Sequence, residues 1–477
     1  MKKERLEIIV SLIWAIAALV LGLRFIKNNY AIGLTNEINT QVSKSAQIFW
    51  LIVAIAIAWI LIFSFVRFIF NAIEGDSYER RVLLYAVPFF SSFFMAVLVN
   101  RHNGYYFTWD DKNIWDAAVR LYPYFFVYAS EIYLICFFIL PLALAPVLVK
   151  IVLAALIMGY VVYRFESHYK NKWPYLMFLL CIVPAFFIYG SYVHRMHWYG
   201  FIYLFAMVKI YFDIVEGHKN VSENLYVIII LSLLTVWRRE GIYLLVFGAV
   251  LFAMAYLKGL EKKQVAKWLL VFFACELLFF IPVMLDGGMK EKGLEVDAML
   301  VHIMGEKSFD RDKVSEELKI IDQYVDISII DKWNQDMGWS GFDTNAFDGV
   351  ESPYYMQREN KGVSYEEFSR AVISVILKEP LVFISSRVHA FWAAGRALNS
   401  FNLVLPLILI VLCTIYGIVR RDKAMLIMMV GVLVHISITT LTMPASFDKY
   451  FFHMWLMGYI FIFVLFEEIM KIKRHPL

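Results

Sequence analysis

The chain has 477 residues, of which 61% are hydrophobic and 17% aromatic, and its mean hydropathy is +0.64. Only 18% are charged, against about 25% in ordinary soluble domains, and a globular protein could not keep so much apolar side chain off its surface. This excludes a soluble enzyme, a disordered scaffold and a fibrous protein, and it predicts an all-α polytopic membrane protein. The net charge is +4, and no run combines basic clusters with aromatic residues as nucleic-acid binding requires.

Apolar runs of spanning or near-spanning length recur along the chain and predict about twelve transmembrane helices. The runs cover residues 6–23, 47–67, 82–99, 143–163, 174–190, 198–214, 224–237, 241–257, 267–285, 402–419, 424–441 and 450–468. The first run follows basic residues, but no small-x-small cleavage site comes after it. We therefore expect a retained helix there rather than a signal peptide.

Residues 122–142 are apolar and aromatic but contain Glu131, so they form either a further span or a helix at the membrane interface. If they lie at the interface, the basic loops all fall on the side of the N-terminus. These loops are 67–81, 164–172, 258–267, 420–423 and the tail 471–474. The positive-inside rule then places both termini in the cytoplasm. We therefore predict interfacial juxtamembrane helices in a first large outer loop.

The pattern divides the chain into four parts. Residues 1–80 hold two N-terminal transmembrane helices, and 81–285 form a transmembrane core with the outer loop 100–142. Residues 286–379, the acidic loop, carry 20 Asp and Glu against 11 Lys and Arg and are predicted to be extracytoplasmic. Residues 380–477 hold the C-terminal transmembrane helices.

Local signals predict structure inside the acidic loop. Ser364 and Glu367 have the spacing of a capping box before an amphipathic helix that runs to Pro380. Residues 309–332 are also predicted to be helical, and 333–362 to be irregular. None of the four cysteines lies in the acidic loop, and none has CxxC spacing, so we expect neither disulfides nor a zinc site. This usage favours a bacterial plasma membrane.

The first candidate for chemistry is the pair Asp110 and Asp111, which ends the run Tyr106–Asp111 in the first outer loop. Two adjacent carboxylates beside aromatic side chains could have a raised pKa, which suits a general base. They could instead bind a divalent cation. A solvated acidic loop with an interfacial aromatic belt accounts for the same residues.

The second candidate is Trp237-Arg-Arg-Glu240, the whole connection between two apolar runs. Arg238 and Arg239 would lie at membrane depth or just above it, where charge is costly and usually functional. Arginine is suited to bidentate contacts with phosphate or pyrophosphate. The alternative is an Arg–Glu pair that only neutralises itself.

Two further outer segments contain cations. His194 and His197 share a helical face, but no third metal ligand is fixed by spacing, which favours Arg195 as an anion contact over a metal site. Lys449, within Asp448–Tyr450, could meet a phosphate or extend to the interface from a helix end.

Four ionisable residues lie in or near apolar runs: Lys150, Lys209, Glu276 and His435. Such groups are functional candidates by default. The lysines could equally extend to the interface, and Glu276 could pair with a neighbouring helix.

The order of these motifs resembles the GT-C superfamily of polytopic glycosyltransferases, which includes mannosyl- and arabinosyltransferases that use dolichyl- or undecaprenyl-phosphate sugars. Trp109-Asp110-Asp111 followed by the aromatic segment 122–142 matches its acidic motif and juxtamembrane helices. Arg239-Glu240 and Lys449-Tyr450 match its later outer motifs, and the helix ending at Lys378-Glu-Pro380 is similar to one in bacterial members. The resemblance covers residues 80–470, and the first two spans are an addition.

The resemblance implies transfer of a sugar from a polyprenyl-phosphate donor to a hydroxyl of a glycan, lipid or protein acceptor, with inversion, on the extracytoplasmic face. Asp110 or Asp111 would deprotonate the acceptor. The departing phosphate would be stabilised by Arg238, Arg239, Lys449 and Arg195. Supporting roles would fall to Glu240, Tyr450, His194, His197 and Glu131. A lipid-phosphate donor needs no nucleotide-binding domain, and the sequence has no nucleotide-binding motif.

Two other functions remain open. A Wzy-type polysaccharide polymerase or ligase has a similar layout but depends on outer-loop arginines rather than on a catalytic acid. A transporter or flippase of lipid-linked saccharide would be expected to show inverted repeats and broken midplane helices, and neither is visible in the sequence.

Overall fold

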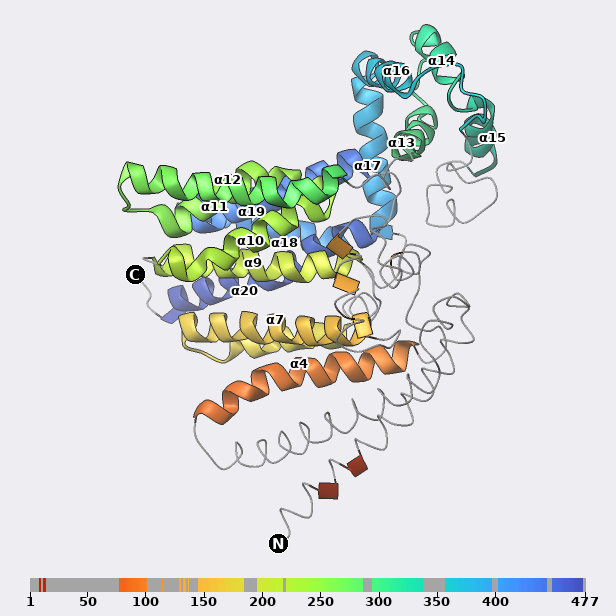
Figure 1. Ribbon diagram of the computed structural model, residues 1–477. Helices are drawn as coiled ribbons and strands as arrows, with labels where there is room; N and C mark the ends of the chain where they lie inside the picture. Colours follow the sequence, from red (N-terminus) through yellow and green to blue (C-terminus); the bar gives the residue numbers. More distant parts are fainter. Residues whose placement is uncertain are drawn as a thin grey trace, which may run out of the picture. The chain divides into compact units, whose positions relative to one another are not determined.

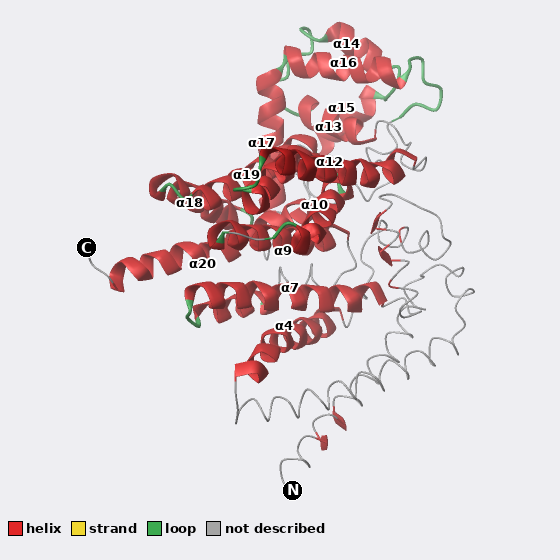
Figure 2. Ribbon diagram, turned by 60° about the vertical axis from the view of Figure 1, so that its left-hand side comes forward, coloured by secondary structure: helices red, strands yellow, loops and turns green. Residues whose placement is uncertain are grey.

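The computed structural model describes residues 77–100, 145–183, 195–217, 220–285, 294–337, 357–396, 402–443 and 448–474, with isolated positions between 8 and 136. Most of these residues are helical, and no β-strand occurs among them, apart from an isolated bridge between Val325 and Gln357 (Figure 2). The predicted all-α class is confirmed for this part of the chain.

Six helices among the described residues are long and apolar enough to cross a membrane. They are Ala145–Tyr169, Arg195–Glu216, Arg239–Leu257, Lys262–Met284, Lys423–Thr442 and Asp448–Glu467. Shorter apolar helices cover Leu84–Phe94, Ser222–Trp237 and Val404–Arg420. The chain is therefore a helical membrane protein. The total of about twelve spans stays a prediction, because the runs at 6–23 and 47–67 and the end of 174–190 lie outside the described residues.

The described helices belong to two compact units. The first contains residues 1–238 and 252–286, and the second contains 239–251 and 287–477.

In the first unit, consecutive helices pack side by side (Figure 1). The helices are α4 (Ser77–Asn100), α7 (Ala145–Tyr169), η1 (Trp173–Ile182), α9 (Arg195–Glu216), η2 (Ser222–Asn224), α10 (Leu225–Trp237), η4 (Ala253–Leu257) and α12 (Lys262–Leu285). The pair α4 and α7 approach closely at Gly159, where a Cβ atom would lie 2.9 Å from the Leu84 carbonyl oxygen. Small residues allow such close helix contacts in membranes.

A buried ion cluster joins three helices of this unit. Asp213 on α9 is fully buried and accepts hydrogen bonds from the Tyr256 hydroxyl at 2.6 Å, from Arg164 at 3.3 Å and from Lys209. Arg164 also pairs with Glu216 at 3.2 Å. Two cations and two carboxylates therefore neutralise one another, as buried charge requires. Lys209, a candidate from the sequence, belongs to this structural cluster.

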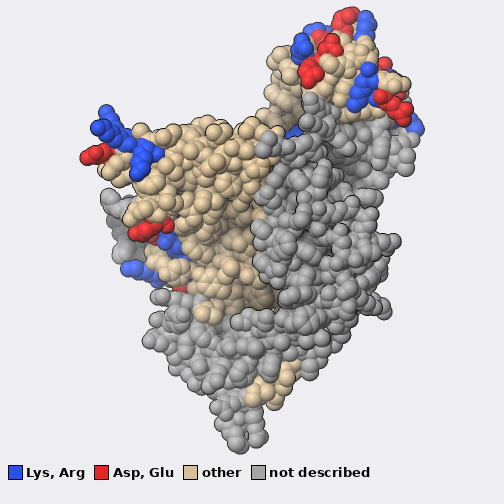
Figure 3. Space-filling view, in the orientation of Figure 1, with Lys and Arg blue, Asp and Glu red and all other residues tan. Residues whose placement is uncertain are grey.

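α12 exposes large apolar side chains of the kind that face lipid. Its exposed apolar side chains include Leu270, Leu277, Leu278 and Met284. Figure 3 shows a broad surface without charged side chains over this part of the first unit. Because such a surface is unfavourable in water and favourable against acyl chains, it supports membrane insertion of α12.

In the second unit, three apolar helices pack together beside a group of shorter helices. The elements are η3 (Arg239–Tyr243), most of α11 (Leu244–Phe252), α13 (Leu294–Met304), α14 (Ser315–Ile321), α15 (Ile327–Met337), α16 (Tyr365–Lys378), α17 (Pro380–Arg396), α18 (Val404–Arg420), α19 (Lys423–Thr442), η9 (Asp448–Phe451) and α20 (Phe452–Arg474). α18 contacts both α19 and α20. At the α18–α20 crossing, a Cβ atom on Gly458 would lie 2.7 Å from the Pro406 carbonyl oxygen, so only glycine fits.

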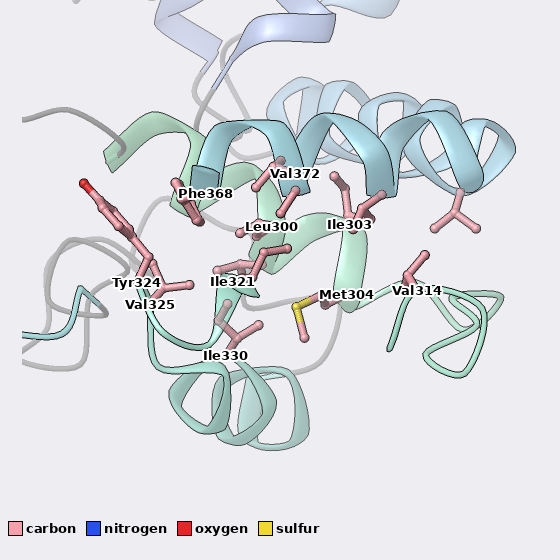
Figure 4. Close-up of a cluster of buried hydrophobic side chains, with 14 residues drawn as sticks. Leu300, Ile303, Met304, Val314, Ile321, Tyr324, Val325, Ile330, Phe368 and Val372 are labelled. Carbon is pink, nitrogen blue, oxygen red and sulfur yellow. The ribbon is translucent and has the colours of Figure 1, made fainter. Parts of the chain in front are cut away.

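The acidic loop has a hydrophobic core of its own (Figure 4). Tyr324 stacks on Phe368 with ring centroids 4.4 Å apart, and Leu300 and Ile321 are fully buried beside them. The core extends to Val382 on α17. A charged surface over an apolar core explains why this segment is polar in sequence yet folds compactly.

Two predictions within the acidic loop need correction. The helix predicted at 309–332 is two shorter helices: α14 follows turns at 305–314, and α15 follows a turn at 322–324. After the break, α15 begins where Asp326 accepts hydrogen bonds from the amide and hydroxyl of Ser328 at 3.0 and 2.6 Å, as a residue that caps a helix start does. The segment 333–362 is irregular only in part, because α15 continues to Met337; residues 338–356 lie outside the described residues.

The capping box at the start of α16 is confirmed. The Ser364 hydroxyl accepts from the Glu367 amide at 3.2 Å, and the Glu367 carboxylate accepts from the Ser364 amide at 2.9 Å. We expect Ser364→Ala to destabilise α16 by about 1 kcal/mol, because one amide loses its acceptor. Hydrogen exchange followed by mass spectrometry should show faster exchange in the first turn of α16. Ser369→Ala, inside the same helix, is the matched control, and equal protection in both variants would contradict the prediction.

Arg387 connects α17 to two other elements of the second unit. Its side chain is 1% exposed, and Nη1 donates to the Met443 carbonyl oxygen at 3.0 Å, at the end of α19. Nη2 lies 2.7 Å from Nδ1 of His302 on α13. Since a guanidinium can only donate, Nδ1 of His302 is the acceptor and the ring is neutral.

His302 makes the second unit sensitive to mild acid. Burial, with the Arg387 charge, holds the pKa of His302 well below its usual value of 6.5. The unfolded chain therefore takes up a proton that the folded chain cannot, and stability is lost as pH falls below about 6.5, by about 1 kcal/mol down to pH 5.5. Thermal unfolding of the wild type and of His302→Asn over this range should show a steeper loss in the wild type. Three carboxylates also have lowered pKa values, and the stability that they contribute is lost only at lower pH, where they take up protons: Glu317, Asp326 and Glu367. Parallel curves for the two proteins would refute the assignment.

Candidate functional site

The start of α9 and the end of α10 lie side by side in the first unit. Trp237, the last residue of α10, is buried, and its indole Nε1–H donates to the Arg195 carbonyl oxygen at 3.1 Å. Arg195 is the first residue of α9. The indole therefore occupies an acceptor at the first turn of α9 and fixes the two helix ends to each other.

Arg238 turns back onto α9. It follows α10 in extended conformation, with φ −140° and ψ 153°. Its guanidinium carbon lies 5.5 Å from the ring centroid of Tyr199, within cation–π range. Arg195 and Tyr199 are four residues apart and so share one face of α9. The Arg238 guanidinium therefore lies at the first turn of α9, where Arg195 begins the helix.

These four residues, Arg195, Tyr199, Trp237 and Arg238, are called the arginine cluster below. Arg195 is 4% exposed and Arg238 is 2% exposed. Two guanidinium groups in so buried a place attract an anion strongly, because solvent screens them little. The positive end of the α9 dipole adds to this attraction. Arginine's planar fork suits phosphate oxygens, so the cluster can bind a phosphate group.

The two neighbouring arginines differ sharply in environment. Arg238 is buried in the first unit, whereas Arg239 is exposed and begins η3 in the second unit. Glu240, the next residue, is half-buried. From the sequence, both arginines are predicted to bind phosphate in the same way. Their burial, which only the structure shows, distinguishes them.

The second unit contains two further candidates, Lys449 and Tyr450. Lys449 is half-buried on η9, and its ammonium lies 5.9 Å from the ring centroid of Tyr450. The carboxylate of Asp448 accepts from the Lys449 amide at 2.7 Å and caps this short turn. Both η3 and η9 pack against α19.

A buried aromatic stack in the second unit was not predicted. The His435 ring lies 3.8 Å from His453 and 4.9 Å from Tyr243, measured between centroids. His435 is fully buried and His453 is 1% exposed. The sequence marked His435 as an ionisable group in an apolar run. It gave no sign of His453, because their proximity depends on how α19 and α20 pack.

Several candidates cannot be placed. Asp110, Asp111, Glu131 and His194 lie outside the described residues. His197 is buried on α9. Its pairing with His194 stays a prediction, because His194 lies outside the described residues. Among the described residues, no group of three or more His, Cys, Asp and Glu side chains is arranged to hold a metal ion.

Tyr128, in the segment 122–142, contacts α12. The Tyr128 hydroxyl donates to the Phe279 carbonyl oxygen at 2.7 Å, and the two rings stack 5.4 Å apart. Tyr128 therefore packs on α12 within the first unit. The predicted location of the segment at the membrane interface, rather than across the membrane, stays a prediction.

The arginine cluster is the arrangement with the clearest chemistry in the described part of the chain. It combines two buried cations, a helix N-terminus and an aromatic wall. No family model, curated protein or solved structure matches the chain.

Proposed function

We propose that the chain is a membrane glycosyltransferase. It moves a sugar from a polyprenyl-phosphate donor to a hydroxyl of a glycan, lipid or protein acceptor, with inversion, on the extracytoplasmic face of a bacterial plasma membrane. The observation that carries this proposal is the arginine cluster, in which Arg195 and Arg238 are buried around one helix turn. A phosphate attached to a membrane lipid is an anion that can reach such a site from the bilayer.

The charge change during the reaction explains the use of two arginines. The donor phosphate is a diester with a single negative charge. When the bond to the sugar breaks, it leaves as a monoester that carries a second charge. Cations held in a water-poor site stabilise this charge more in the transition state than in the ground state, which is the condition for acceleration.

The proton of the acceptor needs a base, and Asp110 or Asp111 is proposed for that role from the sequence. The base draws the hydroxyl proton as the oxygen attacks the anomeric carbon. Binding of a divalent cation is the other role proposed for this pair. Arg239 and Lys449 are proposed as further phosphate contacts on sequence grounds, with Glu240, Tyr450, His194, His197 and Glu131 in support.

The direct test uses the purified chain in lipid nanodiscs with a panel of radiolabelled polyprenyl-phosphate sugars. We expect sugar transfer or slow hydrolysis with at least one donor, and loss of activity in Asp110→Asn or Asp111→Asn. Asp312→Asn, at an exposed carboxylate of the acidic loop, is the matched control. Activity that survives both substitutions would favour a Wzy-type polymerase or ligase. Binding without turnover across the panel would favour a transporter or flippase.

A further inference from the structure

Glu276 is the one charged residue in the stretch 268–285 of α12. Its side chain is 1% exposed, whereas Leu277 beside it is 60% exposed. The carboxyl group therefore points into the first unit, away from the lipid-facing surface of the helix. It lies within a candidate membrane span.

Two hydroxyl groups of α10 face this carboxyl group. Thr235 Oγ1 lies 3.1 Å from Glu276 Oε1 and 2.9 Å from the Leu231 carbonyl oxygen. One hydroxyl proton cannot serve both acceptors. If it is donated to Leu231, the contact with Glu276 is a hydrogen bond only when Glu276 itself carries a proton.

Unused hydrogen-bonding capacity remains at the same place. Ser232, one turn before Thr235, is fully buried and lies close to the same carboxyl group, but not in hydrogen-bonding geometry. Within the described part of the chain, neither Ser232 Oγ nor Glu276 Oε2 has a hydrogen-bond partner. Buried polar atoms are normally hydrogen-bonded, so these two oxygens are available to a further partner.

Among the described residues, the elements with the most contacts to α12 are α10 and η4, and they supply no cation to Glu276. The titratable group of η4, Tyr256, donates its hydroxyl proton to Asp213, and Tyr128 donates to the Phe279 carbonyl oxygen. Lys267 is nine residues away, about 13 Å along the helix, with its ammonium over Trp268. No ion pair to Glu276 occurs among the described residues.

A carboxylate in this environment needs a positive partner, since an isolated charge inside a membrane is very costly. We propose that Glu276, Thr235 and Ser232 form a monovalent-cation site within the α10–α12 pair. The site holds a proton as a carboxylic acid, or a sodium ion after the exchange of Glu–COOH and Na⁺ for Glu–COO⁻·Na⁺ and H⁺.

The donor set fits a small hard cation. The two carboxyl oxygens and the two hydroxyl oxygens are ligands of the kind that hard cations take. One carboxylate neutralises one positive charge, which suits a monovalent ion. A divalent ion would leave an uncompensated charge in the membrane. This inference does not depend on the proposed glycosyl transfer.

The experiment uses the full chain in nanodiscs and two readouts. Dicyclohexylcarbodiimide is apolar and reacts with protonated carboxyl groups, so it should modify Glu276, as identified by peptide mass spectrometry. Infrared spectra should show the carbonyl band of an un-ionised acid in the wild type and its loss in Glu276→Gln. Glu366→Gln, at an exposed residue of α16, is the matched control and should leave the band unchanged.

Comparison of sodium with potassium chloride distinguishes the two occupants. Slower modification and a weaker acid band in sodium alone identify a sodium site, and the double substitution Ser232→Ala and Thr235→Val should abolish that difference. Equal modification and an equal band in both salts identify the proton as the occupant. A wild type with no acid band, no modification and no response to sodium would overturn the proposal.

Discussion

Arg238→Ala is expected to lower kcat/KM for a polyprenyl-phosphate sugar by about 100- to 1000-fold, with most of the loss in kcat. Arg238 is 2% exposed, so its charge acts on the phosphate with little screening by water. The effect falls on kcat because the second phosphate charge develops only as the bond to the sugar breaks. Steady-state kinetics with the radiolabelled donor measure both constants.

Arg239 supplies the comparison that the structure makes possible. It is the next residue but is exposed, so Arg239→Ala should cost less than about tenfold, as expected for a screened surface charge. Arg238→Lys keeps the charge and loses the planar fork, so it should recover only part of the activity. Unfolding temperatures of all three variants verify that the fold is intact. A result in which Arg239→Ala abolishes activity and Arg238→Ala is nearly normal would move the phosphate site away from the arginine cluster.

Arg387→Ala is expected to lower the free energy of unfolding of the second unit by about 3 kcal/mol. The substitution leaves Nδ1 of His302 and the Met443 carbonyl oxygen without their donor, and each such loss costs about 1–3 kcal/mol. It also leaves a cavity in place of a buried side chain. Faster hydrogen exchange in α13 and α17 and a lower unfolding temperature would report the loss.

Two variants sharpen this second test. Arg311→Ala removes an exposed arginine that pairs with Asp331, and it should cost less than about 1 kcal/mol. Arg387→Lys can retain one of the two contacts and should fall between the alanine variant and the wild type. Wild-type exchange rates in Arg387→Ala would show that the acidic loop is held to α19 by other contacts.

The sequence was most informative where structure depends on near neighbours. The apolar run at 424–441 predicted α19, which covers Lys423–Thr442, and the run at 198–214 predicted α9. A membrane-spanning segment must satisfy its backbone internally, so its helical form follows from hydropathy alone. The cap formed by Ser364 and Glu367 was predictable for the same reason, since its hydrogen bonds close within four residues.

The candidate site was predictable in its residue types but not in its arrangement. The sequence named Arg195 and Arg238 separately as anion contacts. The indole of Trp237, whose bond to Arg195 crosses 42 positions, groups them around one turn. The difference between Arg238 and Arg239 had no sequence signal, because adjacent residues of the same type carry the same local information. The proton base at Asp110 or Asp111 stays a prediction from sequence.

Tertiary structure alone decided which face of α12 points into the protein. α12 is apolar around its whole circumference, so its sequence gives no preferred face, unlike the amphipathic α16. The rotation of α12 about its axis is set by packing against α10, and that packing turns Leu277 to the outside and Glu276 towards Thr235. The sequence by itself therefore showed that the chain is a helical membrane protein with a charged loop, and it identified the basic residues that are candidates for binding phosphate. Contacts between helices far apart along the chain decided which of these side chains meet, because helix rotation and crossing are not encoded in hydropathy.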